Sequence, residues 1–115
     1  MVNSKAELDR SFLALSHPVR RAMVERLVAG PSTVGDASRG LGVSKPAVTK
    51  HVKVLEEAGV VSRTVAGRKH LLRLQPRPLR DAASWLDLHR SLWEAKFEAV
   101  EHYLAETDQG QEVPE

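Results

Sequence analysis

Residues 43–61 read VSKPAVTKHVKVLEEAGVV, and this stretch constrains the fold more than any other part of the sequence. On a helical wheel at about 100° per residue, its apolar and cationic residues separate onto two sides. The apolar side consists of Val48, Val52 and Leu55, with His51 and Ala58 at its margin. The other side consists of Pro46, Thr49, Lys50 and Lys53. We therefore expect a helix that packs on the domain through one side and displays positive charge on the other.

The ends of this helix are marked by residues with known terminal preferences. Ser44 is a favourable N-cap, because its hydroxyl oxygen can accept a hydrogen bond from the N–H of Ala47. Pro46 is tolerated in the first turn, where its missing N–H has no partner to lose. Gly59 can adopt the left-handed conformation that ends many helices. The sequence predicts a helix over about 45–58.

After Gly59 the apolar period changes from about 3.6 residues to 2. VVSRTV (60–65) and KHLLRL (69–74) are rich in apolar and β-branched residues. They flank AGR (66–68), whose glycine suits a turn that needs a positive φ. The pattern predicts a β-hairpin over 60–74 with a basic tip.

Three helices are expected before this segment. Leu8, Phe12 and Leu15 follow a helical spacing, which predicts a helix over about 5–16. A second helix can begin at Pro18 and end before Gly30. A short third helix is expected over about 33–41. Its candidate N-caps are Ser32 and Thr33.

A long helix is expected from Leu79 to about Ala105, because apolar residues recur there every seven positions. Residues 108–115 are acidic and aperiodic, so we expect a disordered tail after a domain over 1–107. Four of the five aromatic residues lie on the long helix, which favours a dimer core over an aromatic pocket for an organic effector. The expected dimer interface comprises Leu8, Phe12, Leu15, Leu86, Trp93, Phe97, Val100 and Leu104.

Composition limits the classes of protein to consider. The 115 residues suffice for one domain, and no run approaches the roughly 18 apolar residues of a membrane span. The N-terminus is polar and lacks the pattern of a secretory signal. The absence of cysteine excludes disulfides and thiolate metal sites, and it suits a cytoplasmic protein.

The net charge of +2 conceals an uneven distribution. Residues 1–76 carry 13 Lys and Arg against 6 Asp and Glu, whereas residues 77–115 carry 4 against 9. A basic segment on an otherwise acidic chain indicates a polyanionic partner for that segment.

The order of elements agrees with this charge. A short helix, a tight turn and a basic helix form a helix-turn-helix, and the hairpin forms a wing. The sequence therefore predicts a mainly α-helical, dimeric winged helix-turn-helix protein that binds double-stranded DNA. A winged helix used only for protein–protein interaction is the alternative. The candidate DNA-binding residues are Ser44, Lys45, Pro46, Thr49, Lys50, Lys53, Arg63, Arg68 and Lys69.

Two segments carry a family resemblance. LALSHPVRRAMVERL and VSKPAVTKHVKVLEEAGVVSRTVAGRKHLLRL resemble the ArsR/SmtB family of bacterial winged-helix repressors. The resemblance implies a homodimeric repressor that a small signal releases from its operator. By position it implies base reading by Lys45, Pro46, Thr49 and Lys50. Lys45 replaces a residue that is often glutamine in the family, which favours guanine O6/N7 or phosphate as its partner. His51 borders the core, so we expect packing or a phosphate contact there.

Metal sensing is the family property that fits least well. The cysteine clusters of family sensors are missing here. Asp87 and His89 match half of the alternative site on the last helix, but Val100 and Tyr103 stand where its other ligands belong. A metal-responsive repressor that uses Asp87, His89 and His102 is the alternative. Because zinc needs about four ligands, we expect no metal site.

An enzyme is disfavoured as well. No glycine-rich phosphate loop, nucleophile elbow or complete ligand set accompanies the 5 histidines and 15 carboxylates. We expect no catalytic residues and no cofactor. The identity of an effector does not follow from the sequence.

Overall fold

The computed structural model describes residues 4–111, and side chains as far as residue 108. The chain divides into two compact units, the first ending at Ala82 and the second beginning at Ala83. The domain predicted over 1–107 therefore spans both units.

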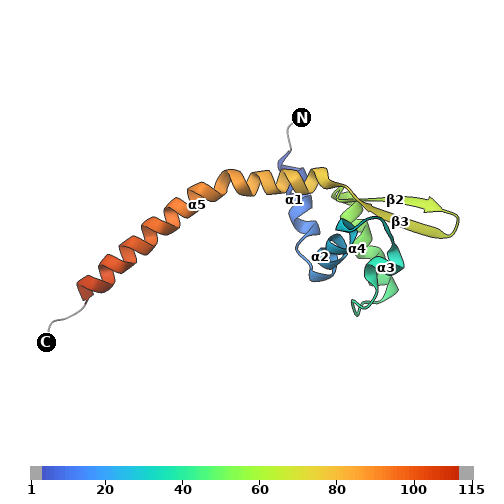
Figure 1. Cartoon of the computed structure of the whole chain (residues 1–115), viewed down its shortest axis with the longest axis horizontal. Helices are drawn as coiled ribbons and strands as arrows, with labels where there is room; N and C mark the ends of the chain where they lie inside the picture. The colour runs from blue at the N-terminus through green and yellow to red at the C-terminus, as the bar shows by residue number, and fades with distance from the viewer. Residues whose placement is uncertain (1–3, 112–115) are drawn as a thin grey trace. The chain divides into compact units, whose positions relative to one another are not determined.

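The structure is mainly helical with a small antiparallel sheet, as predicted (Figure 1). In chain order its elements are α1 (Lys5–Ala14), α2 (Pro18–Val28), β1 (Ser32–Thr33), α3 (Val34–Ser38), α4 (Lys45–Glu57), β2 (Val61–Ala66), β3 (Lys69–Leu74) and α5 (Pro76–Gln111). The predicted order of helices and hairpin is confirmed.

The segment before α4 differs from the prediction in two ways. Ser32 and Thr33 form a short strand that pairs with β3, so the sheet has the order β1-β3-β2. The predicted third helix ended three residues too late, because Arg39 leaves the helical region at φ −60° and ψ 130°. Thr33 is the N-cap of α3, since its hydroxyl accepts the N–H of Asp36 at 3.1 Å.

The bounds of α5 also differ from the prediction. The helix begins at Pro76 rather than Leu79, because proline's fixed φ suits the first turn of a helix. It continues to Gln111, six residues past the predicted end at Ala105. The first residues of the expected tail are thus helical, and residues 112–115 lie outside the described residues.

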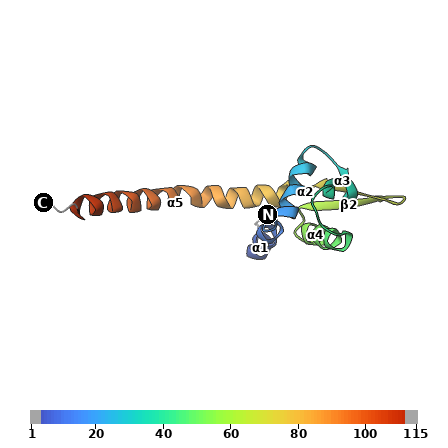
Figure 2. The ribbon, with the colours of Figure 1, turned by 90° about the horizontal axis from the view of Figure 1, so that it is seen from below.

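The hairpin has a two-residue turn. Ala66 pairs with Lys69, so Gly67 and Arg68 connect the strands. Gly67 has a φ of +63° and Arg68 does not have a positive φ, which is the pattern of a type II′ turn with glycine first. The tip of the hairpin extends beyond α3 and α4 in both views (Figures 1 and 2).

The core of the first unit lies between α2, α4 and the sheet. α2 contacts α3, α4 and β3, and α4 contacts α1, α2 and β2. Apolar side chains on the inner faces of these elements exclude water, and their burial supplies the main favourable free energy of folding. The largest fully buried residues are Met23, Val52, Leu55, Val60 and Leu72.

One buried arginine connects three helices of this core. Arg20 of α2 is only 8% exposed. Its guanidinium donates to the carbonyls of Leu13 and Ala14, both at 2.9 Å, and contacts His51 Nδ1 at 3.0 Å. The two carbonyls belong to the end of α1, where carbonyls lack a partner inside the helix. Arg20 thus joins α1, α2 and the inner margin of α4.

A second arginine of α2 serves α3 in the same way. Arg26 donates to the carbonyl oxygens of Ala37 at 3.0 Å and Arg39 at 2.8 Å. These carbonyls lie at the C-terminal end of α3, where cations are favoured by the helix dipole. Two arginines of α2 therefore hold the ends of the two flanking helices.

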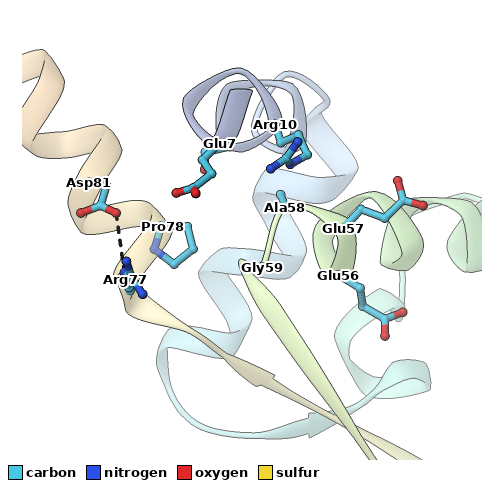
Figure 3. Close-up of a pocket in the computed structure, with 10 residues that line it drawn as sticks. Glu7, Arg10, Glu56, Glu57, Ala58, Gly59, Arg77, Pro78 and Asp81 are labelled. Atoms are coloured by element: carbon cyan, nitrogen blue, oxygen red, sulfur yellow. Dashed lines mark ion pairs between the residues drawn. The ribbon is translucent and has the colours of Figure 1, made fainter. Parts of the chain in front are cut away.

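The end of α4 is fixed by a Schellman motif. Gly59, at φ +71°, donates its N–H to Glu56 O at 2.9 Å, and Val60 donates to Leu55 O at 3.0 Å. A Cβ at Gly59 would lie 3.6 Å from Pro78 in the first turn of α5. Figure 3 shows this junction, beside a hollow of about 380 Å³ between α1, the end of α4 and the first turn of α5.

Within residues 4–111, none of the helices combines the length and apolarity that a membrane crossing requires.

Replacing Arg20 with methionine should destabilise the protein by about 2 kcal/mol, because the carbonyl of Ala14 and the ring of His51 lose a charged donor. Urea unfolding at fixed protein concentration measures the change. The matched control is Arg21→Met, on the same helix, where an exposed guanidinium makes a single bond to Leu15 O. We expect a change below about 0.5 kcal/mol there. Equal shifts for the two variants would contradict the role assigned to Arg20.

Candidate nucleic-acid interface

The local signals around α4 produce the predicted helix. Ser44 is the N-cap, and its Oγ accepts the N–H of Ala47 at 3.3 Å. Val48, Val52 and Leu55 are buried, so the apolar side faces the core as predicted. These contacts fix which side of α4 remains in contact with solvent.

The outward side of α4 carries uncompensated positive charge. None of its three lysines forms an ion pair with any side chain that the structure describes. The unpaired N–H groups of the first turn add partial positive charge at the same end. The exposed residues of this surface are Ser44, Lys45, Pro46, Thr49, Lys50 and Lys53.

Two candidate residues of the wing are equally accessible. Arg68 lies in the hairpin turn and Lys69 begins β3, and both are exposed. Since the tip extends beyond α3 and α4 in both views, these cations can reach a ligand that lies along α4 (Figures 1 and 2).

Arg63, the third candidate of the wing, has partners inside the protein. Its side chain is 27% exposed and forms an ion pair with Glu56 at 2.6 Å. The guanidinium also lies 3.1 Å from His70 Nδ1 across the hairpin, and its Nε is buried without a partner. Arg63 therefore connects the wing to the end of α4.

Strand periodicity alone could have indicated this placement. Arg63 lies two residues after the buried Val61, on the same face of β2, and pairs with the buried Leu72. The positive charge of Arg63 made it a candidate for DNA binding, whereas its place on the strand indicates an inward face. The roles of Arg20 and Arg26 in α2 have no such local signal, because no sequence pattern shows which carbonyls they meet.

Two hollows flank the first turn of α3. One, of about 470 Å³, lies between this turn and the wing. The other, of about 410 Å³, lies between α3 and the N-terminal half of α4. Val34 and Gly35 line both hollows. The start of α3 thus lies between the cations of α4 and those of the wing.

His51 faces inward, as its position on the wheel predicted. Its Nδ1 accepts from Arg20, so a neutral ring carries its proton on Nε2. The ring of His17 lies 4.4 Å away, and His17 Nδ1 accepts the N–H of Val19 at 3.1 Å as the N-cap of α2. Both histidines therefore act as hydrogen-bond acceptors, and their rings meet where α4 packs on the start of α2.

Protonation of His51 is unfavourable. Burial lowers the pKa of His51 from its ordinary value, and the neighbouring His17 and Arg20 lower the pKa further. Burial also lowers the pKa of Arg20. A proton on His51 Nδ1 would remove the acceptor of Arg20 and place two cations side by side.

The three residues of the metal alternative each have another partner. His89 Nδ1–H donates to Trp85 O at 2.8 Å, and Asp87 pairs with Arg90 at 3.4 Å. His102 lies 3.0 Å from Glu106. Among the described side chains, no group of three or more His, Asp or Glu is arranged to hold a metal ion.

Comparisons with known proteins agree with the helix-turn-helix geometry. A family model described as a helix-turn-helix domain matches residues 15–64. The chain is 46% identical over 82 residues to the HTH-type transcriptional regulator Rv2034 of Mycobacterium tuberculosis. This match covers 71% of this chain and 75% of the relative. It is 30% identical over 79 residues to the transcriptional repressor SdpR of Bacillus subtilis, covering 69% of this chain and 88% of SdpR.

A solved structure extends the similarity to the whole fold. The crystal structure of an ArsR family transcriptional regulator superposes with a TM-score of 0.74 at 31% identity. The match covers 82% of this chain and 97% of the other.

The environment of His51 predicts that the stability of the protein falls at acidic pH. In the folded protein the pKa of His51 lies below the ordinary value of histidine, so the unfolded chain binds the proton more readily. The contribution to stability is complete above about pH 6.5 and is lost as the pH falls through the lowered pKa. Urea unfolding at several pH values measures this loss, and His51→Gln, which can still accept from Arg20, should reduce it.

The matched control is His102→Gln, which removes an exposed histidine and should retain the acid-dependent loss. Parallel stability curves for the wild type and His51→Gln would exclude His51 as the group responsible.

Proposed function

Because this chain belongs to the ArsR/SmtB family of winged helix-turn-helix transcriptional regulators, we propose that it is a homodimeric repressor that reads an inverted-repeat operator. The observation that carries the proposal is the outward side of α4, where cations that pair with none of the described side chains lie on a helix whose opposite side is buried. Such a surface suits the phosphates and base edges of a major groove. Since chromosomal DNA is the proposed ligand, we place the protein in the cytoplasm.

In this proposal α4 is the recognition helix and enters the groove with its N-terminal half first. Lys45 and Lys50 are long enough to reach guanine O6 and N7, and Thr49 and Pro46 lie beside them. Ser44 and Lys53 contact the flanking phosphates. Glu57, at the far end of the helix, stays away from the duplex.

The wing contributes contacts with the DNA backbone. Arg68 and Lys69 are exposed at the tip and would bind phosphate or enter the adjacent minor groove. Arg63 was a candidate for the same role. Its ion pair with Glu56 supports a positioning role instead, in which Arg63 sets the angle between wing and recognition helix.

Dimerisation would use the apolar stripe of the second unit. Leu86, Trp93, Phe97, Val100 and Leu104 lie on one side of α5 and are between 38% and 63% exposed. A stripe of this size suits an interface with another chain. We propose a second copy of this protein as the partner, and we propose that Leu8 and Phe12 of α1 and the following Leu15 also take part in the interface. The two recognition helices would then read half-sites about one helical turn apart.

DNA binding can be tested on a duplex selected by the protein from a random library, by fluorescence anisotropy over a salt series. Affinity should fall steeply with salt, because neutralised phosphates release counterions. Lys50→Ala should weaken specific binding by about 1–3 kcal/mol. Arg68→Ala should weaken specific and non-specific binding alike and reduce the salt slope by about 1.

The control is Lys5→Ala, which removes an exposed lysine from α1 and should leave both affinity and slope unchanged. Salt-independent binding, or full affinity in Lys50→Ala, would contradict the proposed interface.

The oligomeric state can be tested by sedimentation. Phe97→Glu places a carboxylate in the stripe and should convert the dimer to a monomer with weakened operator binding. Leu88→Glu is the matched control, because Leu88 is 71% exposed on the other side of α5. A wild-type protein that sediments as a monomer would favour the alternative, a module whose stripe binds a different protein.

A further inference from the structure

The hollow between α3 and α4 has a largely apolar lining. Its volume is about 410 Å³, and Val34, Gly35 and Val48 contribute only carbon atoms and backbone to its walls. Ser38, Thr49 and Lys45 complete the lining. An apolar hollow on a basic surface is suited to bind a ligand that carries an apolar group on a polyanion.

The two hydroxyl groups of the lining are already used as donors. Thr49 Oγ1–H donates to the carbonyl of Lys45 at 3.1 Å. Ser38 Oγ–H donates to the carbonyl of Val34 at 2.8 Å. Each hydroxyl has a single hydrogen, so neither has one left to donate to a ligand, and each oxygen can only accept. Thr49 also offers its γ-methyl for an apolar contact.

The hollow also has room beside α3. A Cβ added at Gly35 would meet no atom within 4 Å, so the space above this residue is empty of protein. Lys45, in the first turn of α4, lines the same hollow. Its ammonium group can bind a phosphate or a guanine while an apolar group enters beside it.

We propose that this hollow receives the C5-methyl group of a thymine in each operator half-site. The inference rests on the proposed function and adds to it a base preference. In the major groove the thymine methyl is the apolar group that base edges present, and threonine methyl and other apolar side chains contact it. The methyl would lie against Val34, Val48 and the γ-methyl of Thr49, next to the group held by Lys45. Thr49 is thereby a specificity-determining residue that reads the base through carbon.

Uracil differs from thymine only by this methyl, so it provides the sharpest probe. Duplexes are first selected from a random library by the full-length protein. Each thymine of the selected duplex is then replaced by uracil, one at a time, and affinity is measured by fluorescence anisotropy at constant salt. At one position per half-site we expect affinity to fall about fourfold, the value for one buried methyl group. Replacement in both half-sites should lower it about 15-fold, because the two sites are far apart and additive.

Two protein variants separate this contact from a general loss of binding. Thr49→Ser keeps the hydroxyl and its bond to Lys45 O but removes the γ-methyl, so it should reduce the thymine-to-uracil affinity ratio toward one. Lys53→Ala removes a cation that does not line the hollow. It should weaken binding to both duplexes and leave their ratio unchanged.

The outcomes distinguish this inference from the proposed function. Enrichment of a sequence in which uracil is neutral at every thymine would overturn the methyl contact and leave the repressor intact. A ratio that Thr49→Ser does not change would overturn the assignment to Thr49. A library from which no sequence is enriched would overturn the proposed function and this inference with it.

Discussion

The guanidinium of Arg20 is the interaction on which the arrangement of the first unit depends. A buried charge is expensive, and Arg20 meets no carboxylate among the described residues. Its partners are the carbonyls that end α1, where the helix dipole is negative, together with the ring of His51. The same group therefore ends one helix, belongs to a second and fixes the inner margin of α4. The outward direction of the lysines on α4 follows from this anchoring and from the burial of Val48 and Val52.

The basic side chains of this protein have two roles, and arginine is used for one and lysine for the other on α4. Arg20, Arg26 and Arg63 bond to groups of the protein itself, and a planar guanidinium with five donors can bond to several acceptors at once. On α4 the exposed cations are Lys45, Lys50 and Lys53, which are compact charges on flexible stems. The excess of positive charge over residues 1–76 therefore overstates the charge available to DNA, because part of it is satisfied within the protein.

α4 and the hairpin are connected at their bases as well as through the core. The Schellman motif at Gly59 directs the chain from α4 into β2, and the ion pair between Glu56 and Arg63 joins the same two elements four residues later. A duplex that contacts α4 and the tip of the wing would therefore meet surfaces whose relative position is set in advance. Preorganised surfaces lose less conformational entropy on binding. The start of α3 lies between them and adds an apolar hollow to an otherwise cationic surface.

The sequence by itself determined α4, the hairpin and the exposure of the lysines, because their signals are local. A serine cap, a left-handed glycine and a 3.6-residue period each act within a few residues of the structure they specify. Tertiary structure decided what depends on distant partners. The strand β1 exists through pairing with β3, forty residues away, and Arg63 is satisfied by Glu56 across an element boundary. Arg20 and Arg21 are neighbours in the sequence but point to different surroundings. Only the folded structure shows that Arg20 is buried against the end of α1 whereas Arg21 is exposed.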